Sequence, residues 1–212
     1  MPKTVIIYDC DGVLIDSRES NRAFYNDILA HFGLPPLTEE QLDYVQVSTS
    51  GQAVDFLFQG TTCKDAAQAY QFTLNNEPYI ARLRLEPHVR EVLAALRPHY
   101  RTAVATNRGR SLALILKHFH LDGLFDLTVS SYDVSLPKPH PQGLLKILEH
   151  FQAPPQAALY LGDSEVDRLV AQRAGVDFIA YKNSILEAPF HLEDHLDLLA
   201  LLDKDQLLGA RD

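Results

Sequence analysis

Two carboxylates stand two residues apart near the start of the chain, in the segment Asp9-Cys10-Asp11-Gly12. This segment closes the apolar run 5–8, which has the composition of a buried strand. Side chains two apart in an extended segment point to the same face, and burying two unpaired carboxylates would cost several kcal/mol. The pair therefore predicts a divalent metal site, an aspartyl nucleophile, or both. By itself such a motif is also typical of a solvated turn.

A hydroxyl and an amide follow another apolar run. Thr106 and Asn107 come directly after residues 102–105 and stand before a helical pattern. Donors at the end of a strand and the start of a helix suit a bound anion. The alternative is that one of the two side chains merely caps the helix.

Lys138 lies between two prolines, in Leu136-Pro137-Lys138-Pro139-His140-Pro141. Because prolines restrict the backbone on both sides of it, the position of this lysine is unusually well defined. Such an ammonium suits a phosphate or a buried carboxylate. An ordinary exposed loop lysine is the alternative.

A second acidic cluster, Gly162-Asp163-Ser164-Glu165-Val166-Asp167, follows the apolar run 157–161 and opens a helix. Asp163 at the strand end can complete a metal site begun by Asp9. Asp167 lies one helical turn further on, so we expect it to support the site rather than to coordinate directly. Capping of the helix by Asp163 or Ser164 is the alternative.

Strand-like and helical patterns alternate along most of the chain and position these clusters. Strands are expected at 4–9, 102–106, 124–130, 157–161 and 177–181, and helices at 87–96, 110–119, 141–151, 165–174 and 191–202. Short apolar runs without alternation are typical of strands buried on both faces of a parallel sheet. The pattern predicts an α/β fold with a doubly wound, Rossmann-like parallel sheet. All four clusters follow strands, where open α/β sheets place their sites.

Residues 16–85 interrupt the alternation with a long helical tract. Helices are expected at 20–32, 38–47, 52–59 and 64–85, with a capping box from Thr38 to Gln41 and helix ends at Gly33 and Gly60. We therefore expect a catalytic core of residues 1–15 and 86–212, with a small all-helical cap of residues 16–85 inserted after the first strand.

Composition excludes several classes of protein. The 212 residues are 46% hydrophobic and 22% charged, with a net charge of -9. This acidic balance argues against a nucleic-acid or anionic membrane partner. No apolar stretch is long enough to span a membrane, and no signal-peptide pattern stands at the N-terminus, so we expect a cytoplasmic protein. The nine histidines are scattered and predict no metal site, and residues 191–197 are expected to be a solvated helix face.

The four clusters, in this order, resemble the motifs of the haloacid dehalogenase-like hydrolase superfamily, in its phosphoglycolate phosphatase-like branch. Asp9-Cys10-Asp11-Gly12-Val13 resembles the first motif, Thr106-Asn107 the second, Lys138-Pro139 the third, and Gly162-Asp163 with Asp167 the fourth. The resemblance covers nearly the whole chain. Dehalogenases lack the second aspartate that Asp11 supplies, and hexose-phosphate mutases carry Glu-Asp where this chain has Gly162-Asp163.

The resemblance implies an Mg²⁺-dependent phosphatase that acts on a small phosphorylated metabolite, with phosphoglycolate or a sugar phosphate expected. Asp9 would be the nucleophile, and Asp11 would protonate the leaving oxygen and then activate water, which requires its pKa to rise. Mg²⁺ would be held by Asp9, the backbone carbonyl of Asp11, and Asp163. Thr106, Asn107 and Lys138 would bind the phosphoryl group. The family pattern leaves a monomer or a homodimer open.

Two departures from the family pattern, His88 in place of glycine and Arg108 in place of lysine, are expected not to touch the chemistry. A sugar-phosphate phosphomutase is the alternative function, and a phosphoreceiver signalling module is the alternative from another class. Between residues 24 and 80 the only Lys or Arg is Lys64, which disfavours a second anionic group on the substrate unless arginines at the cap's edges serve (Arg18, Arg22, Arg82 and Arg84). We expect the polar turn Ser50-Gly51-Gln52 to face the leaving group.

Overall fold

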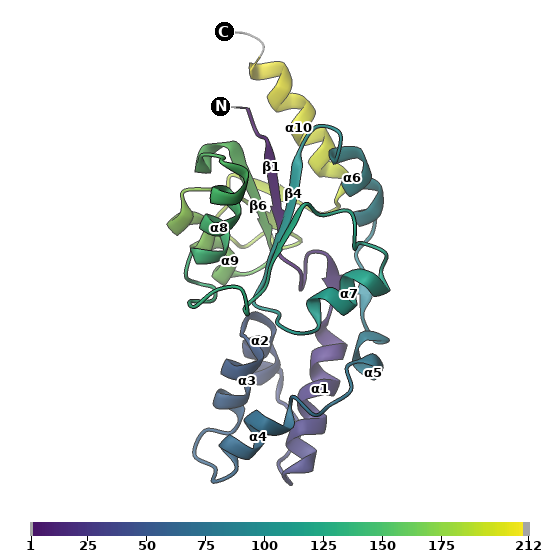
Figure 1. The fold of residues 1–212 in the computed structure, drawn as a ribbon, viewed down its shortest axis with the longest axis vertical. Coiled ribbons are helices and arrows are strands. Elements are labelled where there is room, and N and C mark those ends of the chain that lie inside the picture. Colours follow the sequence, from purple (N-terminus) through teal and green to yellow (C-terminus); the bar gives the residue numbers. More distant parts are fainter. Residues whose placement is uncertain (1, 210–212) are drawn as a thin grey trace.

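The computed structural model describes residues 2–209 and has a six-stranded sheet at its centre (Figure 1). Every neighbouring pair in this sheet is parallel, and the order is β5-β4-β1-β6-β7-β8. Its strands are β1 (Val5–Tyr8), β4 (Arg101–Ala105), β5 (Leu127–Val129), β6 (Ala158–Gly162), β7 (Asp177–Tyr181) and β8 (Phe190–Leu192). The α/β, Rossmann-like fold expected from the alternating pattern is confirmed.

Helices cover both faces of the sheet. The central strand β1 shows this, since its alternate residues belong to two different apolar clusters. Ile6 and Tyr8 pack with α6 (Val89–Leu96), α7 (Leu112–His118) and α10 (Leu196–Gly209). On the other face, Val5 and Ile7 pack with α8 (Gln142–Phe151) and α9 (Glu165–Ala174). A short 3-10 helix, Pro155–Ala157, leads into β6. Both faces of β1 are therefore buried, as its uninterrupted apolar run predicts.

Five helices lie beyond the carboxyl end of the sheet, where they form the lower part of Figure 1. They are α1 (Arg18–His31), α2 (Glu39–Val47), α3 (Ser50–Leu57), α4 (Lys64–Tyr70) and α5 (Glu77–Ile80). Buried side chains of α1 to α4 and the segments between them, among them Ile28, Leu42 and Phe58, form an apolar cluster separate from the two that flank the sheet. Ile80 of α5 instead packs in the sheet-face cluster that includes α6 and α7. This separation is what a helical insertion with its own core would produce.

The chain enters and leaves this helical segment through a two-stranded antiparallel pair. Strand β2 (Ile15–Asp16) pairs with β3 (Arg84–Leu85), so the two crossing points are held side by side. Within the segment, Thr38 forms the expected capping box: its hydroxyl accepts from the Gln41 amide at 3.2 Å. Residues 16–85, the predicted helical insertion, are called the cap.

Three expected elements differ from the structure. Residues 64–85 are not one helix, because α4 ends at Tyr70 and the chain forms turns before α5 and β3. Ser50-Gly51-Gln52 is not a turn but the first turn of α3, capped by Thr49. The region 191–202 begins with the edge strand β8 rather than with a helix. Among the described residues, no helix is both long and apolar enough to cross a bilayer.

The expected solvated face at 191–197 is also wrong at its centre. His195 is fully buried, its Nε2 lies 2.8 Å from the Val13 carbonyl oxygen, and its ring packs 4.5 Å from that of Tyr181. Burial lowers the pKa of His195, since an imidazolium would have to give up its hydration there. This histidine is therefore part of the core beneath α10.

Candidate active site

The polar residues that follow β1, β4 and β6 converge at one end of the sheet. These three strands are neighbours in the sheet, and all are parallel, so their carboxyl ends meet at the same edge. A cavity of about 120 Å³ lies between this edge and the cap. Its walls include Asp9, Asp11, Thr106, Asn107, Lys138 and Asp163. The structure thus brings all the predicted site residues together, and all of them except the buried Asp167 line the cavity.

Lys138 is the centre of a buried ion-pair network. Its Nζ lies 2.9 Å from Asp9 Oδ1 and 2.7 Å from Asp167 Oδ1, and the lysine side chain is only 9% exposed. It also donates to the Tyr160 hydroxyl at 2.9 Å. Although burial alone would lower the pKa of Lys138, the two carboxylates raise it, so the side chain stays an ammonium. The alternative of an exposed loop lysine is wrong.

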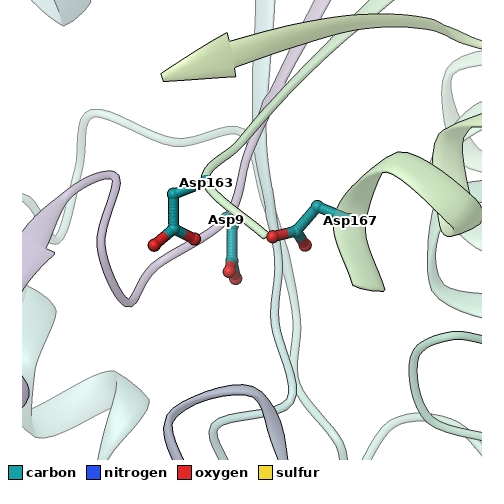
Figure 2. Close-up of side chains that lie close together, drawn as sticks. All are labelled: Asp9, Asp163 and Asp167. Atoms are coloured by element: carbon teal, nitrogen blue, oxygen red, sulfur yellow. The ribbon is translucent and has the colours of Figure 1, made fainter. Parts of the chain in front are cut away.

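Three carboxylates crowd around this single ammonium. Figure 2 shows Asp9 with Asp163 on one side of it and Asp167 on the other, and one oxygen from each lies within 4.8 Å of the others. Burial, followed by repulsion from the neighbouring carboxylates, raises the pKa of Asp9 to about 7 and that of Asp163 to about 8. When all three acids are ionised, their negative charge exceeds what Lys138 offsets, and a divalent cation fits such an all-oxygen donor set.

The backbone at Gly12 leaves room for one of these carboxylates. Gly12 has a φ of +76°, and a β-carbon at this position would lie 2.0 Å from Asp163 Oδ2. Any side chain at residue 12 would therefore displace the Asp163 carboxylate. The missing side chain at Gly12, in the first acidic motif, thus leaves room for Asp163 of the second acidic motif, 151 residues later in the chain.

Asp167 supports the site rather than opening toward a cation. Both of its oxygens already have partners: Oδ1 accepts from Lys138 and from the Tyr160 hydroxyl, each at 2.7 Å. Oδ2 accepts from the Ser164 hydroxyl at 2.5 Å and from the Ser164 amide at 3.3 Å. The side chain is completely buried, its acceptor sites are occupied, and Lys138 lies between it and Asp9.

Asp11 points away from the acidic cluster and pairs with Arg108. The guanidinium donates from Nε to Asp11 Oδ2 at 2.9 Å and from Nη2 to Oδ1, and each side chain is 13% exposed. Burial alone would raise the pKa of Asp11, but the charge and hydrogen bonds of Arg108 lower it. In this arrangement Asp11 is a carboxylate. The acid role expected for Asp11 requires a raised pKa, whereas the structure lowers it.

Arg108 is not among the predicted site residues, yet its guanidinium contacts Asp11, so the expectation that this departure lies away from the inferred chemistry is wrong. Besides Asp11, its guanidinium donates to the Ser111 hydroxyl at 3.1 Å and to Asn21 Oδ1 of the cap at 3.2 Å. Its position directly after Thr106-Asn107 was the available signal. The other departure, His88, has a φ of +59°, which explains why a glycine suits this position, and its ring binds Asp194 at 2.8 Å.

Thr106 and Asn107 are both buried and neither caps a helix. The Thr106 hydroxyl accepts from the Arg108 amide at 3.1 Å. The Asn107 side chain donates to the carbonyl oxygens of Val47 at 2.8 Å and Lys138 at 3.1 Å, and accepts from the Lys138 amide at 2.9 Å. Asn107 thereby connects the end of β4 to the cap and to the loop that carries Lys138, called the lysine loop.

The cap contributes aromatic and amide side chains to the cavity rather than cations. Its lining includes Phe24, Phe72 and Tyr79 with Asn21, Gln46 and Gln71. Of the expected polar turn only Ser50 lines the cavity, because the Gln52 side chain folds back onto Thr49. The cap-edge arginines do not reach the cavity either: Arg18 and Arg22 form ion pairs with Glu39.

Comparisons with known proteins agree with this geometry. The family model described as haloacid dehalogenase-like hydrolase matches residues 6–181. A protein of Caldanaerobacter subterraneus subsp. tengcongensis, provisionally named the pyrophosphatase PpaX, is 35% identical over 91% of this chain and 86% of its own. Phosphoglycolate phosphatase of Mannheimia succiniciproducens is 30% identical over 93% and 97%.

A solved structure has the same fold. The crystal structure of a HAD-superfamily hydrolase of subfamily IA, variant 1, from Geobacter sulfurreducens superposes with a TM-score of 0.82 and 38% identity. The match covers 94% of this chain and 99% of that one, so it extends over both the sheet and the cap.

Proposed function

Because the chain belongs to the haloacid dehalogenase-like hydrolases and is a phosphatase of the phosphoglycolate phosphatase-like branch, we propose that it hydrolyses a small phosphate monoester through an aspartyl-phosphate on Asp9. The observation that carries this proposal is the network at the end of β1. One ammonium bridges Asp9 and Asp167 at 2.9 and 2.7 Å, and the Asp163 carboxylate lies beside them.

Asp9 is the nucleophile in this proposal. An Asp9 oxygen attacks phosphorus, the bond to the leaving oxygen breaks, and an alcohol departs. Because a carboxylate and an anionic phosphate repel each other at close range, the site must neutralise charge. Lys138 supplies one positive charge next to Asp9, and Asp167 fixes its position. The Thr106 hydroxyl and the Asn107 backbone amide lie at the cavity wall, where they suit the phosphoryl oxygens that are not transferred.

Asp9, the backbone carbonyl of Asp11 and the Asp163 carboxylate would hold Mg²⁺. When bound, the cation would offset the negative charge of these carboxylates and of the substrate phosphate. Gly12 leaves room for the Asp163 carboxylate, and burial together with repulsion among the neighbouring carboxylates raises the pKa of both Asp9 and Asp163. The Asp11 side chain stays available for proton transfer because only its backbone would face the cation.

Asp11 is the acid and base of the two half-reactions. It protonates the departing oxygen in the first and, as a carboxylate, takes a proton from the water that cleaves the aspartyl-phosphate in the second. The cap closes over the site and excludes bulk water during the first step. This role requires the carboxyl to separate from Arg108 when substrate binds, since the ion pair favours the charged form.

The names of relatives narrow the substrate. One is a phosphoglycolate phosphatase and another carries the name of a pyrophosphatase. We propose phosphoglycolate or a sugar phosphate as the substrate class of this chain, with pyrophosphate as the compound to test against them.

The proposal is tested with p-nitrophenyl phosphate in the presence of Mg²⁺. Asp9→Asn keeps the shape of the side chain but removes the nucleophile, so release of phosphate is expected to be abolished while circular dichroism stays unchanged. Full residual activity of Asp9→Asn would refute the assignment. Asp11→Asn is expected to slow turnover or to trap a phosphoenzyme that acid quenching and mass spectrometry detect on Asp9. Undiminished steady-state hydrolysis by this variant would remove Asp11 from the mechanism.

A further inference from the structure

We propose that Arg108 is a specificity-determining residue that binds an anionic group on the leaving alcohol of the substrate. The inference rests on the proposed function and deepens it. The substrate class would be phosphate esters whose leaving group carries a carboxylate or a second phosphate within about two bonds of the ester oxygen. A planar guanidinium matches either anion with two parallel hydrogen bonds.

Arg108 is a largely buried guanidinium in the wall of the cavity. It is 13% exposed and held by the Ser111 hydroxyl and by Asn21 of the cap, at 3.1 and 3.2 Å. Its remaining donors form a fork that is occupied by a carboxylate, that of Asp11. Both partners line the cavity, so a ligand that enters it can reach the fork.

Arg108 lies next to the residue that is proposed to contact the leaving oxygen. Asp11 is the group that transfers a proton to the leaving oxygen, and Arg108 lies one hydrogen bond beyond Asp11. When the leaving oxygen contacts Asp11, the atoms attached to that oxygen therefore lie next to the guanidinium. An anion in this part of the leaving group takes over the fork and frees the Asp11 carboxyl for the leaving oxygen. A neutral leaving group cannot replace Asp11 in this way, so its ester is expected to be hydrolysed with a lower kcat/KM.

Few cations line the cavity. Only three Lys or Arg side chains do so among the described residues: Lys138, Arg108 and Arg110. Lys138 is bound between Asp9 and Asp167. Arg110 is exposed at the mouth, where it donates to the Phe72 carbonyl oxygen at 3.1 Å and lies 5.6 Å from the Phe72 ring. Since the cap supplies no cation, Arg108 is the one placed to meet a leaving-group anion.

The test compares two esters with the same skeleton, 2-phosphoglycolate and ethyl phosphate, which differ in whether the leaving group carries a carboxylate. The selectivity is the ratio of their kcat/KM values. We expect wild type to prefer 2-phosphoglycolate by roughly 100-fold, and Arg108→Met to reduce this ratio by at least about 30-fold, since a buried charge pair with the substrate is lost. Arg108→Lys should retain part of the ratio, because the charge remains but the fork does not.

Arg101→Met is the matched control, since Arg101 is 67% exposed at the start of β4, at the opposite end of the sheet. Its ratio should equal that of wild type. If Arg108→Met lowers both kcat/KM values in parallel, Arg108 only positions Asp11 and the inference is wrong. If Arg110→Met rather than Arg108→Met lowers the ratio, the specificity belongs to Arg110 and the inference is equally wrong.

A binding measurement covers the case in which Arg108→Met fails to fold with Asp11 buried and unpaired. Asp11→Asn removes the carboxylate that competes for the fork, so calorimetry should show it binding 2-phosphoglycolate at least about 10-fold more tightly than Asp11→Asn/Arg108→Met. Equal affinities would overturn the inference. Hydrolysis of both esters without any preference would also overturn it while leaving the phosphatase function intact, whereas hydrolysis of neither ester nor p-nitrophenyl phosphate would contradict the proposed function itself.

Discussion

The Lys138 ammonium lies 2.7 Å from the Asp167 carboxylate, in a pair whose lysine is 9% exposed and whose aspartate is completely buried. Asp167 accepts further hydrogen bonds from Tyr160 and Ser164, which fix its position. Its ion pair with Lys138 in turn keeps the ammonium beside Asp9. In the proposed mechanism, charge neutralisation next to Asp9 thus depends on a residue whose carboxylate oxygens already accept hydrogen bonds from Lys138, Tyr160 and Ser164.

Asp167→Asn should therefore lower kcat by about 10- to 100-fold with a smaller change in KM, since Lys138 loses its charged anchor but stays in the site. The measurement is steady-state hydrolysis of p-nitrophenyl phosphate. Asp177→Asn is the matched control because Asp177 also pairs with a lysine, Lys3, but is 53% exposed and far from the cavity. If both variants retain wild-type kcat, Asp167 does not position the lysine.

Gly12→Ala tests the space reserved for Asp163. The new methyl group would overlap the Asp163 carboxylate, so we expect the affinity for Mg²⁺, measured as the Mg²⁺ concentration that gives half-maximal activity, to fall by at least about 10-fold. The matched control is Gly33→Ala: Gly33 has a φ of +70° but nothing within 4 Å of the added carbon. That variant should lose about 1 kcal/mol of stability and keep its Mg²⁺ dependence. The same Mg²⁺ dependence in both variants would mean that the contact with Asp163 is unimportant.

The sequence predicted which segments meet at the site because that information is local. Apolar runs end directly before Asp9, Thr106 and Asp163, and parallel strands bring their carboxyl ends together whatever the rest of the chain does. The same argument cannot say where a side chain in a loop points. Arg108 follows Asn107 by one residue, yet its contact with Asp11 spans 97 positions and depends on the backbone path of both loops.

Weak local signals explain the other differences. Strand β8 has three residues, of which His191 is exposed, so its composition does not distinguish it from the start of the next helix. Its identity as a strand comes from pairing with β7, a contact that no short window contains. The burial of His195 likewise depends on Val13 and Tyr181, which lie in distant segments.

The stability of the metal-free protein should fall as the pH rises. The pKa of Asp9 is raised to about 7 and that of Asp163 to about 8, both above their ordinary value of 3.8. A carboxyl with a raised pKa in the folded state contributes stability that is fully present below pH 3.8 and is lost as the pH rises through the folded pKa. Asp11 has the opposite sign, since its pKa is lowered, but its contribution changes only at acidic pH.

We therefore expect the melting temperature in EDTA to decrease between about pH 5 and pH 9, and Mg²⁺ to raise it most at the alkaline end. Thermal unfolding with EDTA or Mg²⁺ across this range is the measurement. Asp163→Asn removes one of the two titrating groups and should flatten the profile in EDTA. A Mg²⁺ effect that is the same at every pH would argue against a cation site made of these carboxylates.

Asn107→Asp tests whether the side-chain amide joins the lysine loop to the cap. The Asn107 amide nitrogen donates to two carbonyl oxygens, of Val47 and Lys138, and a carboxylate oxygen in its place would face both of them without a proton. The free energy of unfolding should fall by about 1 to 3 kcal/mol. KM should rise as well, because Lys138 and the cap lose a shared anchor. Asn75→Asp is the control, since exposed Asn75 only accepts a hydrogen bond, from the Glu77 amide, which an aspartate also accepts. Urea unfolding measures both variants, and equal midpoints would mean that the Asn107 bridge contributes nothing to stability.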